Sequence, residues 1–202
     1  MRKINLLINR FLHLFEICRI KTNEQVVYLT FDDGPEPGIT EFVLEELCKH
    51  NAKATFFCRG DNAEKHPELM KLIKEDGHAL GNHTYNHIKS FDCSTTEYIK
   101  DVERADDVLK THLFRPPWGA LTLSTYFRLR KKFKIVYWSL IGGDATCERF
   151  NYKRSMERLK TTQKGEVVLL HNCQRHADAT RQLLPVYLDW LESQGFVLES
   201  MK

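Results

Sequence analysis

Apolar stretches alternate with amphipathic stretches along most of this chain. Short runs rich in β-branched and aromatic residues indicate buried strands, whereas apolar positions spaced three and four residues apart indicate helices. The predicted strands cover residues 26–31, 52–58, 78–80, 113–115, 135–139, 167–170 and 196–198. The predicted helices cover residues 41–50 with Thr40 as N-cap, 64–76, 98–112 after a capping box at Ser94, 122–132, 152–162 and 179–194.

This alternation predicts parallel strands that are joined by crossover helices. No shift in composition divides the chain, so we expect residues 22–202 to form a single α/β domain. A complete (β/α) barrel typically takes about 250 residues, and this chain has 202. We therefore expect a deformed or incomplete (β/α) barrel with parallel strands. An open doubly wound sheet is the alternative, but no glycine-rich fingerprint follows the first strand.

Residues 1–21 form a distinct amphipathic segment in the same pattern. Apolar side chains recur there at roughly helical spacing, with polar and charged residues between them: Ile4, Leu7, Ile8, Phe11, Leu12, Phe15 and Ile20. The longest apolar run, residues 6–8, is far too short for a membrane-spanning helix or a signal-peptide core. We expect a helix that packs on the domain, with weak contact with a membrane surface as the alternative.

Composition narrows the function classes only slightly. Charged residues make up 28% of the chain and the net charge of +3 is not gathered in a basic block, which argues against nucleic acid as a partner. The six cysteines include no C-x-x-C pair, which favours reduced core thiols over a disulfide framework or a zinc knuckle. These thiols and the lack of a visible signal peptide favour the cytoplasm, with the cell envelope as the alternative. Oligomeric state leaves no trace in the sequence.

Polar residues gather where the predicted strands end. Asp32 and Asp33 follow the first strand, and the Gly34-Pro35 pair stops that strand. Adjacent carboxylates oppose each other's ionisation, so either a cation between them or a catalytic role would account for the pair, with a solvated turn as the alternative. The later strand ends carry His83, His87, Arg115, Asp144 and His171. In a parallel barrel all of these would meet at the carboxyl-terminal rim, where such barrels build their sites.

The residue types at this rim suit a metal-assisted hydrolysis. His83 and His87 are four residues apart, which on a helical turn would place both imidazoles on one face. Two imidazoles and one carboxylate would hold one divalent metal ion, with zinc as the first expectation and cobalt or nickel as alternatives. The other carboxylate could act as a base toward water, while His171 protonates a leaving group and Arg115 pairs with the base. The remaining histidines are expected to be mostly solvated: His13, His50, His66, His78, His112 and His176.

Four segments in this order resemble the polysaccharide deacetylases of carbohydrate esterase family four, which have the NodB-homology fold. The segments are residues 30–35, 83–87, 115–119 and 168–172, and residues 54–57 and 77–78 also match the family. The resemblance extends over about residues 26–198. It implies a deformed (β/α) barrel of the NodB-homology type and a metal-dependent N-deacetylase.

The resemblance also implies roles for individual residues. It makes Asp32 the base, Arg115 the residue that orients the base, and His171 the acid. It makes Asp33, His83 and His87 the metal ligands, and it gives the backbone amide of Trp118 the oxyanion. We also expect Asp144 to support catalysis, and Pro117 and Asn82 to contribute to substrate binding.

Three residues depart from the family pattern. Ile141 stands where a carboxylate is expected to tune His171, and Trp118 replaces a tyrosine, which reshapes the sugar platform. Asn172 replaces an aspartate, which predicts a lower pKa for His171 than in the family.

The expected function is removal of N-acetyl groups from an amino-sugar poly- or oligosaccharide, peptidoglycan or chitin-like, with release of acetate. One alternative is a metal-dependent hydrolase of another C–N amide. The other is a carbohydrate-binding protein whose catalytic network has decayed at Ile141.

Overall fold

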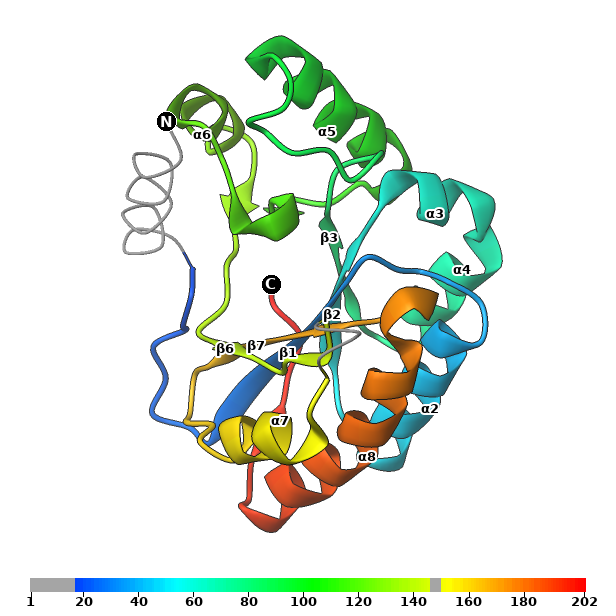
Figure 1. The fold of residues 1–202 in the computed structure, drawn as a ribbon, viewed down its shortest axis with the longest axis vertical. Coiled ribbons are helices and arrows are strands. Elements are labelled where there is room, and N and C mark those ends of the chain that lie inside the picture. The colour runs from blue at the N-terminus through cyan, green and yellow to red at the C-terminus, as the bar shows by residue number, and fades with distance from the viewer. Residues whose placement is uncertain (1–16, 146–149) are drawn as a thin grey trace.

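A computed structural model describes residues 17–145 and 150–202 of the chain. Its centre is one parallel sheet with the strand order β5-β4-β3-β2-β1-β7-β6, and β8 pairs with the start of β1 (Figure 1). The strands are β1 (Val26–Asp32), β2 (Ala54–Cys58), β3 (Ala79–Asn82), β4 (Leu113–Phe114), β5 (Lys134–Ile135), β6 (Leu140–Ile141), β7 (Val167–His171) and β8 (Val197–Leu198). Within the described ranges β5 and β6 do not pair with each other, so the sheet curls without closing. The prediction of an incomplete (β/α) barrel is confirmed.

The helices surround the curled sheet in the same order as the strands. They are α2 (Ile39–Lys49), α3 (Gly60–Lys65), α4 (Pro67–Glu75), α5 (Thr95–Leu109), α6 (Leu123–Leu129), α7 (Tyr152–Leu159) and α8 (Ala177–Ser193). Figure 1 shows α2, α7 and α8 together on one side and α5 with α6 on the other. Helix α8 contacts both α2 and α7, and α5 contacts α6. None of these helices is long and apolar enough to cross a membrane.

Strand β1 lies in the middle of the sheet, between β2 and β7, and both of its faces are buried. Val27, Leu29 and Phe31 belong to the main apolar core, which they share with α2 and α8. Thr30 and Asp32 alternate with them and therefore point to the inner side of the curled sheet. A parallel strand that is covered on both faces is expected to be apolar over nearly its whole length, as residues 26–31 are.

The helices predicted at 98–112, 122–132 and 152–162 end about three residues earlier in the structure, and α5 also begins three residues earlier than predicted. Two other differences have a local cause. The single helix predicted at residues 64–76 is divided into α3 and α4, because the residue before Pro67 is disfavoured in the helical conformation. The predicted N-cap, Thr40, lies inside α2, whose N-cap is Gly38. The Thr40 hydroxyl instead accepts the Glu36 N–H at 2.9 Å.

The beginning of the described chain and the strand predicted at 135–139 also need correction. Residues 17–19 are extended, with Ile17 bridging to Val136 and Arg19 to Glu166, so the predicted helix does not reach these residues. Residues 1–16 lie outside the described part. The predicted strand is reduced to β5, and β6 follows after a short irregular stretch.

The cysteine prediction holds for the residues that the structure describes. All five cysteines in these ranges are free thiols, and Cys58 and Cys173 are buried, although Cys48 is exposed. Cys147 lies outside the described part. His78 is buried, which contradicts its predicted exposure, because its Nδ1 accepts the Ala54 N–H at 3.1 Å.

Candidate active site

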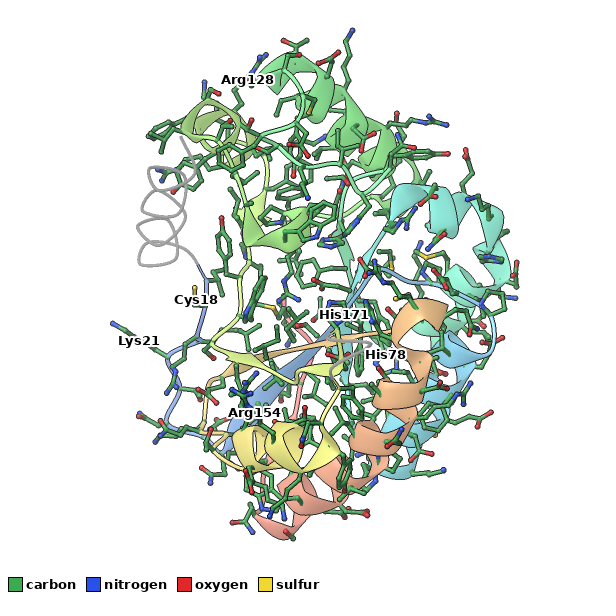
Figure 2. All side chains as sticks on the ribbon, viewed as in Figure 1. Cys18, Lys21, His78, Arg128, Arg154 and His171 are labelled. Atoms are coloured by element: carbon green, nitrogen blue, oxygen red, sulfur yellow. The ribbon has the colours of Figure 1, made fainter. Side chains whose placement is uncertain are left out.

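A cavity of about 350 Å³ lies at the carboxyl ends of the strands. Its lining comes from strands β1, β6 and β7 and from the segments that follow β1, β3, β4, β5, β6 and β7: Asp32, Asp33, His83, His87, Trp118, Trp138, Ile141, Ala145, Leu169, His171, Arg175 and His176. Figure 2 places His171 near the middle of the molecule, whereas the labelled Lys21 projects outward. The strand-end residues predicted to meet therefore do line one cavity or lie directly behind it.

Asp33, His83 and His87 converge at one point of this cavity. Asp33 Oδ1 lies 3.1 Å from His87 Nε2 and 3.6 Å from His83 Nε2, and the three ligand atoms all lie within 4.8 Å of one another. Asp33 Oδ1 is buried and has no hydrogen-bond partner among the described residues. Roughly these separations are expected between ligands of one tetrahedral ion. An orphaned carboxylate oxygen that faces two imidazole nitrogens fits a divalent cation.

The orientation of His83 supports the same interpretation. Its Nδ1 donates to the Arg115 carbonyl at 2.7 Å, so the lone pair of Nε2 points toward Asp33. Burial alone would raise the pKa of Asp33, but the polar contact with His87 and the charges of the surrounding imidazoles hold that pKa well below its usual range. The carboxylate is therefore ionised and available as a ligand.

The loop that carries the two histidines is not the predicted helical turn. Residues 83–87 are irregular, and Thr84 and His87 have φ values of 64° and 56° in the left-handed region. Such values cost about 1–3 kcal/mol for residues other than glycine and persist only where the surroundings enforce them. His83 and His87 therefore meet because the loop is held in this shape.

Asn82 and Asp101 hold that loop. Asn82 accepts the Thr84 N–H at 2.9 Å and donates to the Val102 carbonyl at 2.9 Å. Asn82 is fully buried with its amide occupied by these bonds, so the expectation that it binds substrate is wrong. Asp101 on α5 accepts the backbone N–H groups of Tyr85 and Asn86 at 2.8 and 3.0 Å.

The Asp101→Ala variant is expected to loosen this loop. It removes the acceptor for two backbone N–H groups, which we expect to cost about 1–2 kcal/mol of unfolding free energy. Because His87 is no longer held in place, affinity for a divalent ion should fall about tenfold. Isothermal titration with Zn²⁺ measures the affinity, with Asp107→Ala on the same helix as the exposed control. Unchanged affinity in Asp101→Ala would show that the loop keeps its shape without α5.

Asp32 is held by a buried arginine rather than by the histidine cluster. Arg115 Nη1 donates to Asp32 Oδ1 and to Thr30 Oγ1, both at 2.7 Å, while Nε and Nη2 donate to the carbonyls of Val136 and Tyr137. The Arg115 guanidinium is fully buried and lies 4.1 Å from the centroid of the Phe57 ring. This leaves Asp32 Oδ2 facing the cavity, 3.7 Å from His83 Nε2. A carboxylate with one oxygen fixed and one oxygen open is suited to accept a proton.

Trp118 forms the opposite rim of the cavity. It lies in a single turn of 3₁₀ helix, Pro117–Gly119, with φ at 56°, and its side chain is 55% exposed. Its ring packs on His87 with centroids 4.2 Å apart. Its backbone N–H makes no backbone hydrogen bond within the described ranges, which leaves a donor at the rim. Pro117 is buried and does not line the cavity, so its predicted part in substrate binding is limited to shaping this turn.

His171 is paired with Asp144 on the far wall. Both oxygens of Asp144 lie 3.2 Å from His171 Nδ1, and Oδ2 also accepts the His171 backbone N–H at 2.6 Å. Asp144 is fully buried. Burial alone would lower the pKa of His171, but the charge and hydrogen bonding of Asp144 outweigh it and raise that pKa to about 9. Asp144 therefore supplies the tuning carboxylate that seemed absent at Ile141, which lines the cavity wall.

Asn172 does not affect His171 in the predicted way. Its side chain turns to the Asp-Asp turn, where Oδ1 accepts the Gly34 N–H at 3.1 Å and Nδ2 donates to the Thr40 hydroxyl at 3.3 Å. A Cβ atom on Gly34 would lie only 2.3 Å from the Asn172 amide nitrogen, so the two segments touch. The predicted lowering of the His171 pKa through this position has no structural basis, because Asn172 ties the loop after β7 to the turn after β1.

The His171 titration is expected to have its midpoint at about pH 9. The ordinary imidazole value is 6.5, so the ion pair contributes its full stabilisation below pH 6.5 and loses it as pH rises through about 9. Asp144→Asn removes the largest contribution that opposes burial, so the midpoint should fall below that of the native chain although Asp32 and Asp33 still favour the imidazolium. NMR titration of the imidazole protons measures this, with Asp178→Asn on the exposed start of α8 as control. Identical midpoints in the native chain and Asp144→Asn would exclude the pairing.

Several cavity residues escaped the sequence analysis. Trp138 and Leu169 were counted only as strand residues, and His176 was expected to be solvated, yet its ring is buried and packs against His171 with centroids 5.0 Å apart. Burial and the charge of His171 lower the pKa of His176. Only its position in the sequence could have indicated that His176 lines the cavity, because it follows the carboxyl end of β7 by five residues. Cys173 lies on the same turn, and burial raises the pKa of its thiol, together with the charges of Asp33 and Glu36.

Comparisons with known proteins agree with this geometry. The family described as polysaccharide deacetylase matches residues 19–137. A peptidoglycan-N-acetylglucosamine deacetylase of Bacillus cereus is 38% identical over 125 residues, which cover 58% of this chain and 46% of that relative. This chain thus spans less than half the length of that relative. A chitooligosaccharide deacetylase of Azorhizobium caulinodans is 33% identical over 79% of each chain.

A solved structure of a peptidoglycan deacetylase has the same fold as this chain. The Bc1960 peptidoglycan N-acetylglucosamine deacetylase superposes with a TM-score of 0.85 at 29% identity, covering 92% of this chain and 90% of that one. The similarity therefore extends over nearly the whole chain.

Proposed function

This chain belongs to the polysaccharide deacetylase family, and we propose that it hydrolyses N-acetyl groups of an amino-sugar poly- or oligosaccharide. The observation that carries the proposal is the arrangement around one cavity of an oriented carboxylate, a three-ligand cluster and a protonated histidine. Asp32, the Asp33 cluster and His171 come from β1, from the loop after β3 and from β7, and core packing has no use for such a set. A protein that only binds sugar would not need all three.

Asp33, His83 and His87 would hold the divalent ion, and their oxygen and nitrogen donors suit Zn²⁺, with Co²⁺ or Ni²⁺ as alternatives. When bound, such an ion supplies a Lewis acid that polarises a carbonyl group and acidifies water. The charge of Asp33 balances part of that of the ion. His83 stays oriented through its bond to the Arg115 carbonyl.

Asp32 takes a proton from the water that attacks the acetyl carbon. Arg115 holds Oδ1 of this carboxylate, which leaves Oδ2 facing the cavity. The Trp118 N–H is placed at the rim to donate to the carbonyl oxygen as negative charge develops there. His171, which is protonated at neutral pH, gives its proton to the departing nitrogen. The C–N bond breaks, and acetate and a free amine result.

The exposed indole of Trp118 provides a platform for the sugar ring at the cavity mouth. The relatives named above act on peptidoglycan N-acetylglucosamine and on chitooligosaccharides, so we propose an N-acetylglucosamine polymer or oligomer as the substrate class.

Acetate release from N-acetylglucosamine oligomers tests the proposal directly. Release should stop after a chelator removes the divalent ion and return when Zn²⁺ is added back. The same assay on N-acetylated peptides distinguishes an amino-sugar hydrolase from a hydrolase of another amide. Protein that holds one ion and releases no acetate from any of these oligomers or from peptidoglycan would contradict the proposed activity.

A further inference from the structure

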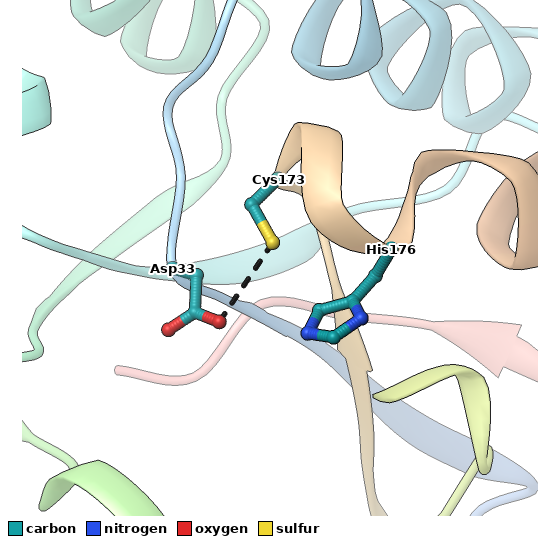
Figure 3. Close-up of side chains that lie close together, drawn as sticks. All are labelled: Asp33, Cys173 and His176. Carbon is teal, nitrogen blue, oxygen red and sulfur yellow. Dashed lines mark hydrogen bonds between the residues drawn. The ribbon is translucent and has the colours of Figure 1, made fainter. Parts of the chain in front are cut away.

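Asp33 directs its two carboxylate oxygens to different groups. Oδ1 faces His83 and His87, as described above. Oδ2 lies 3.8 Å from Cys173 Sγ on the opposite side. Figure 3 shows the Cys173 thiol and the His176 ring both turned toward Asp33.

Cys173 and His176 reach this position through the turn that follows β7. The short 3₁₀ helix Gln174–His176 begins directly after Cys173, and the His176 N–H donates to the Cys173 carbonyl at 3.0 Å. Residues three apart lie above one another in a 3₁₀ helix, so both side chains project the same way. Their exposed fractions are only 4% and 7%.

These three side chains match the requirements of a metal ion. One oxygen, one sulfur and one nitrogen ligand atom all lie within 4.8 Å of one another. Neighbouring ligand atoms on one tetrahedral zinc ion are roughly 3.3–3.7 Å apart, close to the 3.8 Å between Cys173 Sγ and Asp33 Oδ2. A thiolate in the set favours zinc or cobalt over magnesium or calcium.

We propose that Asp33, Cys173 and His176 form a second divalent-cation site, distinct from the Asp33, His83 and His87 cluster, with Asp33 bridging the two. The second ion binds more weakly, because Asp33 is already neutralised by the first ion. Its binding releases the proton of the Cys173 thiol to solvent, since only the thiolate is a strong ligand.

Occupation of the second site has a consequence for His171. The His176 ring packs on the His171 ring, so an ion at His176 lies next to the imidazolium that donates the proton. Excess zinc is therefore expected to lower turnover by placing positive charge beside the proton donor, a consequence that rests on the proposed function, whereas the site itself does not.

Cobalt titration of the whole protein under reducing, oxygen-free conditions tests the site without any substrate. The first equivalent of Co²⁺ should give visible absorption without a thiolate-to-cobalt charge-transfer band, because the first cluster contains no sulfur. Further Co²⁺ should produce that near-ultraviolet band. In Cys173→Ser the band should be lost and the affinity for the second ion should fall at least about tenfold, while the first ion is retained. Cys48→Ser, which alters an exposed thiol on α2, should behave like the native chain.

Two outcomes would overturn the proposal. Native protein that binds one Co²⁺ and shows no thiolate band at excess metal would mean that Cys173 only donates its S–H to Asp33. A band that persists in Cys173→Ser would assign it to another cysteine. Both outcomes are measured by absorbance without substrate. A failure of the second-site proposal can therefore be distinguished from a failure of the proposed deacetylase activity.

Discussion

Turnover of the Asp32→Asn variant is expected to fall about 10²–10⁴-fold, while the divalent ion is retained. Asparagine has nearly the same shape and can still accept the Arg115 N–H, but it cannot take a proton from water. The three residues of the first cluster are unchanged. A kinetic assay together with metal analysis of the same sample measures both quantities.

Asp32→Asn also leaves the buried Arg115 without its counterion. Loss of one partner of a buried ion pair typically costs about 3–5 kcal/mol, so the melting temperature should fall and turnover should be measured well below it. Asp61→Asn is the matched control, because Asp61 also pairs with an arginine, Arg59, but does not line the cavity. Native turnover in Asp32→Asn would assign the base to another residue.

His87→Ala is expected to lose both the ion and the activity. The variant removes one of the three ligands and the ring on which Trp118 packs, so the rim of the cavity changes as well. Loss of a supporting partner of a ligand typically weakens metal binding 10–100-fold, and loss of the ligand itself should exceed about a hundredfold. Metal content after dialysis and acetate release are the two measurements.

The control for His87→Ala is a histidine outside the cavity. His50 pairs with Glu192, and His50→Ala should keep the native metal content and turnover. Together with Asp32→Asn this separates binding from chemistry, since only His87→Ala should lose the ion. If His87→Ala keeps one tightly bound ion, the first cluster is not the site that holds it.

The rim residues could be predicted because strand ends are visible in a sequence. Asp32, Asp33 and His171 each end a short apolar run, and parallel strands bring such ends together. The local shape of the loops could not be predicted in the same way. His83 and His87 meet through left-handed residues and through Asp101, a residue on α5 that no spacing connects with them.

The direction in which a side chain points was the second feature that could not be predicted from the sequence. Asn172 was expected to act on the adjacent His171, yet its amide turns to Gly34, because neighbouring residues of an extended segment point to opposite sides. Asp144 was expected at the rim, but its separation of 27 residues from His171 gives no sign that the two side chains pair. Cys173 looked like an ordinary core thiol until the turn after β7 placed it beside Asp33.

Arg115 connects β1 with the chain segment that crosses the open side of this incomplete barrel. Its guanidinium joins Asp32 on β1 to the carbonyls of Val136 and Tyr137, which lie between β5 and β6, the two edge strands that do not pair with each other within the described ranges. The same group thus links β1 to residues 136–137 and orients the Asp32 carboxylate. A chain in which residues 136–137 have not yet docked leaves Asp32 unrestrained, so chemical competence arises only with completed folding. Selection for thermal robustness and selection for turnover therefore act on one contact, and neither can change there without the other.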